Sequence, residues 1–535
     1  MLTETSSYDQ LCRDFRWDIP AHFNIATACC DRYADGSKRL ALIYVDEDGS
    51  HMRTSFDEMR AFSCRFANVL KANGLARGDR VAVFLSQSLE LPITHLAAFR
   101  AGLVSVPLFT LFGEDALQFR LANSGAKAVV TDEGGFEKLL KIRDRLPELK
   151  TVYFTGDAAR GATSFWSSIE NASDRFETVD SLADDPAIII YTSGTTGNPK
   201  GALHAHRALL GHLPNIEMVH DFMPKPDDVM WTPADWAWIG GLFDALFPAW
   251  YFGVPVVGHR ARKFDPQAAM QLMADHAVRN IFLPPTALKL MRQADVKHAG
   301  VRLRSMLSGG ESLGAELLDW VRLTFGIEVH EVYGQTECNL VVGNNSKLFP
   351  IRPGSMGKAT PGFDVRIVND KGEELPRGER GIIAVRQPNP CTMIEYWRNP
   401  DATVKKYAGT FLLTGDLGRQ DEDGYFWYVS REDDVITSAG YRIGPTEIED
   451  TLLKHPAVAL SAVVGVPDPI RTEAVKAWIV LRPGFAPSED LAREIQDFVK
   501  VKLAAHEYPR QVEFAESLPM TATGKVLRRE LRSRG

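Results

Sequence analysis

The chain has 535 residues, of which 45% are hydrophobic, and its formal net charge at pH 7 is −8. This length exceeds what one hydrophobic core normally supports, so two or more globular domains are expected. The negative charge argues against general nucleic-acid binding, although local basic pockets for phosphates are compatible with it.

The cysteines and the N-terminus indicate a compartment. Six cysteines, at positions 12, 29, 30, 64, 338 and 391, form no CxxC pair and no metal-ligand spacing, which fits reduced thiols in a cytoplasmic enzyme. The first sixteen residues carry Glu4, Asp9 and Asp14 and no apolar core segment, unlike a secretory signal or a typical transit peptide. No run of eighteen apolar residues occurs, so no membrane-spanning helix is expected.

The first third of the chain alternates short apolar runs with helical patterns. Apolar runs at 81–85 and 104–108 flank a predicted helix that extends through Phe99, and further strands are predicted at 126–130 and 152–154. This β-α-β alternation predicts a parallel sheet covered by helices, so the fold class is α/β.

A glycine-rich stretch follows the apolar run at 187–190. Residues 191–201 read Tyr-Thr-Ser-Gly-Thr-Thr-Gly-Asn-Pro-Lys-Gly. Glycines let a backbone approach an anion, hydroxyls can donate to oxygens and lysine adds charge, so the stretch predicts a polyphosphate site made of Thr192, Ser193, Gly194, Thr195, Thr196, Gly197 and Lys200. The Walker A pattern fails, because glycine follows the lysine where a hydroxyl residue is required. A solvated linker is the alternative, but linkers seldom follow a buried-strand pattern.

This loop resembles the phosphate-loop signature of the adenylate-forming superfamily, which includes acyl-CoA synthetases, firefly-type luciferases and peptide-synthetase adenylation domains. The resemblance implies a large N-terminal domain of layered α/β sheets with a small β-barrel-like subdomain, and a small mobile C-terminal α/β domain. It also implies ATP, Mg²⁺ and coenzyme A as cofactors. Residues 17–60 resemble the start of the medium-chain acyl-CoA synthetases.

An aromatic stretch at 231–241 contains three tryptophans, which on their own favour a packed core over a ligand tunnel. By resemblance to the family, Trp238, Ile239 and Gly240 flank the acyl group, and Gly309 and Gly334 belong to the same pocket. Acetate-specific relatives carry tryptophan at the position of Gly334. Glycine there is expected to leave room for a longer acyl chain, which favours a medium-chain or compact cyclic acid.

Residues 308–313 read Ser-Gly-Gly-Glu-Ser-Leu and follow an apolar run. By resemblance they turn against the adenine of the nucleotide, through Gly310, Glu311 and Ser312. The alternative is a helix N-cap formed by Ser308 or Ser312.

Residues 331–337 read Glu-Val-Tyr-Gly-Gln-Thr-Glu and resemble the family signature whose aromatic residue stacks on adenine. Thr336 can hydrogen-bond a phosphate, and Glu337 offers a hard oxygen ligand for the magnesium that screens ATP. An isolated surface glutamate is the alternative for Glu337. The expected nucleotide contacts are Glu331, Tyr333, Gly334, Gln335 and Thr336.

Alternating apolar residues at 353–385 predict a small antiparallel or barrel subdomain. Asp416 follows, and its carboxylate is suited to accept the two hydroxyls of ribose. Asp421 and Asp423 more simply serve a hairpin turn.

Residues 430–444 resemble the hinge of the family, although Ser430 replaces the usual first glycine. By position Arg431 contacts ribose, Asp433 is the pivot, and Arg442 reaches phosphate in one domain orientation. The expected domains are 1–432, with the acyl and ATP sites, and 433–535, which carries the CoA step.

The last hundred residues predict a small α/β domain, with helices at 447–453 and 491–503 and strands at 460–465 and 475–481. Lys525 ends a Thr-Gly-Lys loop that matches the catalytic-lysine motif of the family; one more charge in a basic tail is the alternative. By resemblance Gly440 and Lys500 lie near CoA. The loop also resembles a lysine site that protein acetyltransferases recognise, which makes an acetyltransferase and a deacetylase possible partners.

These motifs occur in the order of the family over nearly the whole chain. They imply that ATP and a carboxylic acid give an acyl adenylate and pyrophosphate, and that the CoA thiolate then displaces AMP. Because the substrate carboxylate is itself the nucleophile, catalysis is positioning and charge stabilisation, with Lys525 bridging both reactants. An aryl-CoA ligase, a luciferase-like oxygenase, an amino-acid adenylation domain, a ligase that loads a carrier protein and a nucleotide sensor are the alternatives.

Overall fold

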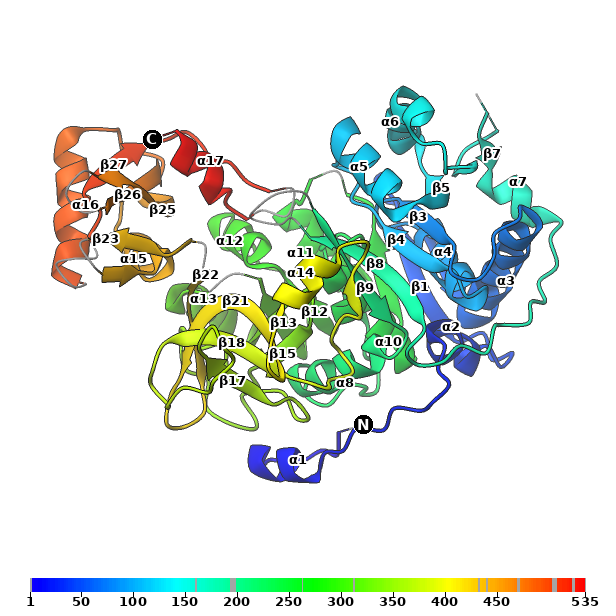
Figure 1. Cartoon of the computed structure of the whole chain (residues 1–535), viewed down its shortest axis with the longest axis horizontal. Coiled ribbons are helices and arrows are strands. Elements are labelled where there is room, and N and C mark those ends of the chain that lie inside the picture. The colour runs from blue at the N-terminus through cyan, green and yellow to red at the C-terminus, as the bar shows by residue number, and fades with distance from the viewer. Residues whose placement is uncertain are drawn as a thin grey trace. The chain divides into compact units, whose positions relative to one another are not determined.

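The computed structural model describes residues 2–158, 161–192, 199–261, 263–310, 313–431, 434–438, 441–468, 472–502, 508–521 and 525–534 (Figure 1). The chain divides into two compact units, Met1–Asp364 with Arg386–Lys406, and Val365–Val385 with Tyr407–Gly535. In the part of the chain that the structure describes, no helix is both long and apolar enough to cross a membrane.

The first unit contains two sheets, and in one of them the predicted β-α-β pattern is confirmed. Its neighbouring strands Val104–Pro107, Arg80–Phe84, Ala126–Thr131, Thr151–Phe154 and Thr163–Ser164 are parallel and largely buried, which suits their continuous apolar sequences. In order across the sheet the strands are β19 (Glu395–Tyr396), β9 (Lys200–Ala205), β8 (Pro186–Thr192), β4 (Val104–Pro107), β3 (Arg80–Phe84), β5 (Ala126–Thr131), β6 (Thr151–Phe154) and β7 (Thr163–Ser164).

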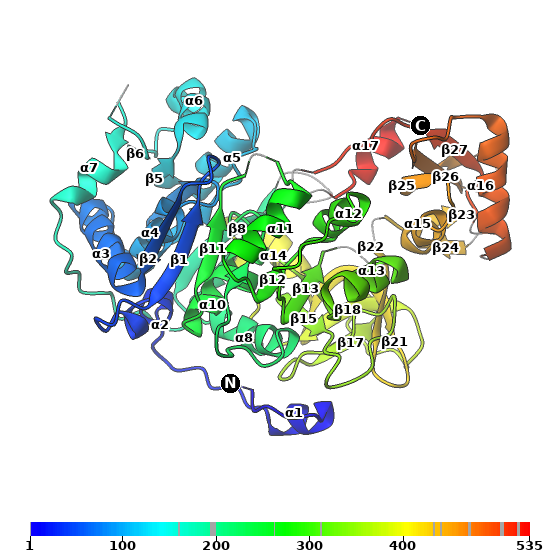
Figure 2. The same cartoon turned by 180° about the vertical axis from the view of Figure 1, so that it is seen from behind.

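The second sheet of this unit contains both parallel and antiparallel strand pairs. Its strands, in order, are β16 (Lys358–Ala359), β15 (Asn339–Gly343), β14 (Val329–Gln335), β13 (Ser305–Gly309), β12 (Asn280–Phe282), β10 (Met230–Trp231), β11 (Val256–His259), β1 (Leu40–Val45) and β2 (His51–Ser55). Figure 2 shows β1, β2 and β11 side by side. Because β12, β13 and β14 are parallel, their carboxyl ends meet at one edge, where ligands of α/β sheets commonly bind.

Helices pack against these sheets and begin at recognisable sequence signals. The longest, α3, starts with a capping box in which Ser55 and Glu58 satisfy each other's backbone N–H groups. The helices of the first unit are α1 (Tyr8–Asp14), α2 (Ile25–Cys29), α3 (Phe56–Ala72), α4 (Glu90–Arg100), α5 (Glu114–Ser124), α6 (Glu133–Ile142), α7 (Phe165–Glu170), α8 (Ala208–Val219), α9 (Ile239–Gly241), α10 (Phe247–Tyr251), α11 (Pro266–Asp275), α12 (Pro285–Gln293), α13 (Ala315–Phe325) and α14 (Pro400–Lys405). The chain between α9 and α10 is a π-helical turn, Leu242–Leu246.

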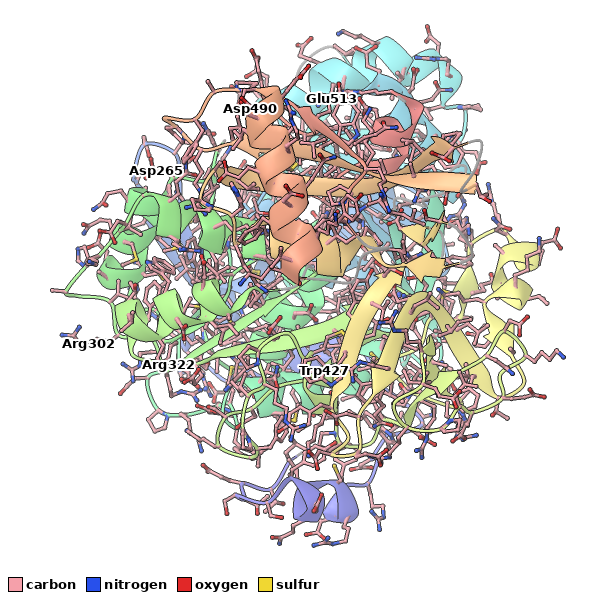
Figure 3. All side chains as sticks on the ribbon, turned by 90° about the vertical axis from the view of Figure 1, so that its left-hand side faces the viewer. Asp265, Arg302, Arg322, Trp427, Asp490 and Glu513 are labelled. Atoms are coloured by element: carbon pink, nitrogen blue, oxygen red, sulfur yellow. The ribbon has the colours of Figure 1, made fainter. Side chains whose placement is uncertain are left out.

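The second unit begins with an antiparallel sheet, as the alternating apolar pattern predicts. It contains β17 (Val365–Val368), β18 (Gly381–Arg386), β21 (Phe411–Gln420), β20 (Tyr407–Ala408) and β22 (Phe426–Arg431). The Asp421 side chain accepts hydrogen bonds from the Tyr425 backbone N–H at 2.9 Å and from the indole N–H of Trp427 at 3.0 Å. Trp427 is labelled in Figure 3. Asp421 therefore serves the hairpin turn, as expected.

The remainder of this unit is the predicted small α/β fold. Its sheet contains β24 (Tyr441–Ile443), β23 (Ile436–Ser438), β26 (Thr472–Leu481), β25 (Val458–Asp468) and β27 (Gln511–Phe514), and its helices are α15 (Pro445–Leu452), α16 (Glu489–Lys502) and α17 (Arg528–Ser533). Apolar residues of α15, α16 and the sheet form one core. Residues 432 and 433 lie outside the described residues, and the domain boundary there stays a prediction.

Candidate nucleotide and acyl site

The expected phosphate loop joins two strands of one antiparallel hairpin. Thr192 ends β8 and pairs with Lys200, the first residue of β9. A side chain at Gly201 would lie 2.7 Å from Ile189 and 3.2 Å from the Tyr191 ring, so this position requires glycine. The other predicted phosphate ligands lie outside the described residues and stay predictions: Ser193, Gly194, Thr195, Thr196 and Gly197.

The Glu337 carboxylate lies next to that hairpin. Tyr396, on the strand that pairs with β9, donates its phenol hydroxyl to Glu337 Oε1. The Lys200 ammonium lies 5.2 Å from the centroid of the same Tyr396 ring. Glu337 is only 8% exposed, so it is not the isolated surface residue of the alternative interpretation. The structure therefore brings together two motifs that are 137 residues apart, through a tyrosine outside both.

A buried histidine, His204, also lies near the Glu337 carboxylate. Burial lowers the pKa of His204 on β9 to about 4, even though the nearby Glu337 opposes the shift. His204 is therefore neutral at pH 7. The positive charge of this region comes from Lys200 and from Lys406, whose ammonium donates to Gln335 Oε1 at 2.7 Å.

The two motifs that are expected to border adenine also meet. Glu331 Oε1 accepts a hydrogen bond from the Leu313 backbone N–H at 3.1 Å. Ser308 lies within β13 and donates its hydroxyl to the Leu283 carbonyl at 2.7 Å, whereas the next helix, α13, has Gly314 at its N-cap. The N-cap alternative is therefore wrong for Ser308.

The remaining residues of these motifs lie as follows. Tyr333 is buried in β14, whereas Thr336 is partly exposed in the turn that follows it. Gly310 is exposed and has a φ of +99°, a conformation that favours glycine. Glu311 and Ser312 lie outside the described residues, and the adenine contacts stay predictions.

The tryptophans of the 231–241 stretch divide into two groups. Trp231 and Trp236 are fully buried, which confirms the core interpretation for them, whereas Trp238 and Ile239 are partly exposed. A side chain on Gly240 would lie 3.0 Å from the Phe282 ring and 3.4 Å from Asp244 Oδ2. Phe282 and Asp244 therefore occupy the side of Gly240 from which a side chain is missing.

Two further glycines of the expected acyl pocket are set by backbone packing. A side chain on Gly309 would lie 2.6 Å from Val332 Cγ2. On Gly334 it would lie 1.6 Å from the Asn339 carbonyl oxygen, because β14 and β15 form a tight hairpin with a bulge there. We expected the missing side chain of Gly334 to leave volume for a longer acyl chain. This reason is wrong, because the backbone of Asn339 fills the space that a side chain on Gly334 would occupy.

The two residues that are expected to hold ribose meet within the second unit. Arg431 Nη1 donates to Asp416 Oδ1 at 2.9 Å, and the Asp416 carboxylate is buried. Thr414 fixes this segment, because its hydroxyl donates to the Ile383 carbonyl at 2.6 Å and accepts from the Asp416 backbone N–H at 3.1 Å. Arg442 lies in β24, and Asp433 and Gly440 lie outside the described residues.

Lys525 is an exposed residue of a short loop. Its backbone carbonyl accepts from the Thr521 N–H at 2.7 Å, and its N–H donates to the Thr521 hydroxyl at 3.1 Å. Lys500 is exposed on α16, with its ammonium 5.4 Å from the centroid of the Tyr508 ring. The roles of both lysines stay predictions.

Sequence reasoning missed Tyr396, Lys406 and the pair formed by Asp244 and Asn339. Tyr396 and Lys406 lie outside every quoted motif, so no spacing could connect them with Glu337 and Gln335. Asp244 offered one signal, an acidic residue inside the apolar run Gly241–Phe247 that periodicity predicts to be buried.

The implied magnesium fits the residues present. Among the described residues no group of three His, Cys, Asp or Glu could hold a metal ion. Mg²⁺ that accompanies a nucleotide is usually bound through one or two carboxylates together with substrate phosphates. The single buried carboxylate of Glu337, beside the hairpin that carries the phosphate loop, suits that arrangement.

Comparisons with known proteins agree with this geometry. The family models described as AMP-binding enzyme and AMP-binding enzyme C-terminal domain match residues 31–397 and 447–525. Acyl-coenzyme A synthetase ACSM3 of Mus musculus, described as mitochondrial, is 38% identical over 99% of this chain and 93% of its own. The Brucella canis acyl-CoA synthetase is 34% identical, with a TM-score of 0.76 over 99% and 98% of the two chains. ATP-bound MatB of Rhodopseudomonas palustris is 31% identical, with a TM-score of 0.84 over 96% and 98%.

The two family-model matches and the fold shared with solved acyl-CoA synthetases define the class of this protein, an enzyme that activates acids as adenylates. The chain belongs to the AMP-binding enzyme family. It is an AMP-forming acid–CoA ligase, an acyl-CoA synthetase with the α/β architecture of its relatives.

Proposed function

We propose that this acyl-CoA synthetase activates a medium-chain fatty acid or a compact branched or cyclic acid. The arrangement of Lys200, Tyr396 and Glu337 carries the adenylation part of the proposal. The Phe282 ring next to Gly240 and the apolar residues Trp238 and Ile239, which directly precede Gly240 in the chain, support an apolar acyl group. An aromatic acid is the second candidate, because the aromatic ring of Phe282 lies next to Gly240.

In the first half-reaction the acid carboxylate attacks the α-phosphorus of ATP, and pyrophosphate leaves. Lys200 and the glycine-rich loop hold the phosphates, while Asp416 and Arg431 hold the ribose. Thr336 would hydrogen-bond a phosphate, and Glu337 would hold Mg²⁺, which neutralises charge on the phosphates. Lys525 stabilises the charge that develops between carboxylate and phosphate.

In the second half-reaction the thiolate of coenzyme A attacks the acyl carbonyl carbon, and AMP leaves with the bonding electron pair. Rotation of residues 433–535 about Asp433 would remove Lys525 and admit CoA. Gly440 and Lys500 are the proposed CoA contacts, and Arg442 is proposed to reach phosphate in one of the two orientations.

The role of Lys525 is tested by assaying the half-reactions separately. Lys525→Ala should lower acid-dependent ATP–pyrophosphate exchange at least about 100-fold, as removal of one transition-state donor does. Thioester formation from supplied acyl adenylate should persist. Arg534→Ala, an exposed basic residue of the same tail, is the matched control and should keep both activities. Equal loss in both half-reactions would disprove the assignment.

Two further parts of the proposal concern the cellular setting. The six cysteines are free thiols, which supports a reducing compartment such as the cytoplasm. Lys525 is exposed, which supports its modification by a protein acetyltransferase and restoration by a deacetylase. Acetylation would remove the positive charge that adenylation uses.

A further inference from the structure

The loop that carries Lys525 leads directly into the helix α17. The two ends of this loop are joined by backbone hydrogen bonds, from the Thr521 N–H to the Lys525 carbonyl at 2.7 Å and from the Leu527 N–H to the Pro519 carbonyl at 2.8 Å. Lys525 is exposed and lies three residues before Arg528, the first residue of α17. The position of the Lys525 backbone therefore depends on how α17 is held.

Arg528 holds α17 to α15 through a largely buried carboxylate. Its guanidinium donates to Glu449 twice, from Nε to Oε1 at 3.2 Å and from Nη2 to Oε2 at 2.7 Å, the paired geometry in which arginine binds carboxylates most strongly. The side chains of Arg528 and Glu449 are 23% and 13% exposed, so the pair is largely shielded from water. Glu449 Oε1 also accepts the Val463 backbone N–H of β25 at 2.7 Å. One carboxylate thus joins α15, α17 and the sheet.

A second carboxylate connects α17 with the proposed hinge. Asp434 directly follows Asp433, the predicted pivot, and its side chain is 12% exposed. Arg528 Nη1 donates to Asp434 Oδ2 at 3.3 Å, and Arg532 Nη2 donates to Asp434 Oδ1 at 3.0 Å. Two arginines that are one turn apart on α17 therefore bind the two oxygens of the same carboxylate.

These polar contacts do something that the apolar packing of the same helix does not. Leu531 of α17 belongs to a buried apolar cluster with Leu518 and Trp478, which keeps the helix against the sheet. Apolar attraction has no preferred direction, whereas hydrogen bonds from a planar guanidinium to two carboxylates require one orientation. Arg528 is therefore suited to fix the orientation of α17 and of the loop that precedes it.

We propose that Arg528 is a positioning residue for adenylation, which holds the loop of Lys525 in place through Glu449 and Asp434. This inference rests on the proposed function, because Lys525 receives its charge-stabilising role there. Arg528 acts through Lys525, and a shift of a catalytic group by about 1 Å can cost about 100-fold in rate. Because Asp434 adjoins the predicted pivot, the same contacts would transmit a rotation about Asp433 to Lys525.

The test is a double-mutant cycle in ATP–pyrophosphate exchange with the full chain, using whichever of hexanoate, octanoate, benzoate and cyclohexane carboxylate reacts fastest. Arg528→Ala should lower kcat and kcat/KM equally, by at least about tenfold, because the positioned lysine acts in the transition state. In the Lys525→Ala background the same substitution should change exchange by less than about twofold, since the group that Arg528 positions is then absent. Arg529→Ala, an exposed neighbour on α17, is the matched control and should keep wild-type exchange.

The possible outcomes separate this inference from the proposed function. If Arg528→Ala does not fold, Arg532→Ala breaks the bond to Asp434 and should give a loss of about threefold that also disappears in the Lys525→Ala background. An equal loss with and without Lys525 would show a general structural role, and wild-type exchange in a folded Arg528→Ala would show no role. Either result would overturn the inference while the role of Lys525 stands. Undiminished exchange in Lys525→Ala, or no exchange with any of the acids, would overturn the proposed function and this inference with it.

Discussion

Tyr396 donates a hydrogen bond to the Glu337 carboxylate and so contributes to its position. A hydrogen bond to a charged group contributes about 1.5–3 kcal/mol. Tyr396→Phe removes only the hydroxyl that donates to Glu337, so pyrophosphate exchange should fall about tenfold to 100-fold at saturating ATP and Mg²⁺.

The matched control is Tyr33→Phe, which removes a similar hydroxyl from the same unit. That hydroxyl donates to the Tyr251 backbone carbonyl at 2.7 Å, away from every motif of the site. If both variants lose the same activity, Tyr396 has only a general structural role and does not position Glu337.

Single residues also show where sequence reasoning stops. Glu337 could be singled out as a candidate, because the other residues of its motif are adjacent in sequence, whereas its contact with Tyr396 could not be foreseen. At Gly334 the sequence shows that a side chain is missing, but it does not show which part of the protein fills the space that a side chain would take. The Asn339 carbonyl, five residues along the chain, fills that space because of the hairpin bulge.

The helix α17 illustrates the same limit at the level of an element. The sequence shows a basic tail, but its arginines are not equivalent. Arg528 bridges Glu449 at 2.7 Å and Asp434 at 3.3 Å, and Arg532 reaches Asp434 at 3.0 Å. The acidic partners are 79 to 98 residues away, so no local pattern could reveal them.

These ion pairs predict that α17 stabilises the second unit. Arg528→Ala leaves the largely buried Glu449 without its cationic partner, and such a loss costs about 3 kcal/mol. Hydrogen exchange of α15 and α17 should accelerate, and the thermal midpoint of the unit should fall. Arg529→Ala, which alters an exposed residue of the same helix, is the control and should behave as wild type. Equal protection of α17 in both variants would contradict the prediction.

Across the whole molecule, the sequence predicts helices and strands from regular apolar patterns, but it does not predict contacts between residues that are far apart in the chain. The parallel strands β3 to β6 and the helices α15 and α16 follow from apolar periodicity and agree with the prediction within a few residues. Contacts between distant segments of the first unit, such as those of Asn339 with Asp244 and of Tyr396 with Glu337, depend on tertiary packing. They have no counterpart in local sequence.

Buried histidines give the first unit a predictable dependence on pH. Burial lowers the pKa of His95 and of His220 to about 3, and that of His204 and of His206 to about 4. Each is neutral in the folded chain but protonates below pH 6.5 when the chain unfolds, so stability falls as pH decreases from 6.5. Glu217 and Asp235 act oppositely, because burial raises their pKa values to about 7 and the folded state then binds their protons.

His95 offers the cleanest measurement, because its ring makes one hydrogen bond, to the Ser105 hydroxyl at 2.7 Å. Between pH 8 and pH 5 it alone should reduce the free energy of unfolding by about 2 kcal/mol, since 1.5 pH units lie below the unfolded pKa of 6.5. His95→Gln cannot titrate, so the difference between its stabilities at pH 8 and pH 5 should be smaller by that amount. Urea unfolding of both proteins at the two pH values measures this, and the comparison at pH 8 corrects for any packing cost of glutamine. If the variant loses as much stability as the parent on acidification, His95 is not held neutral by burial.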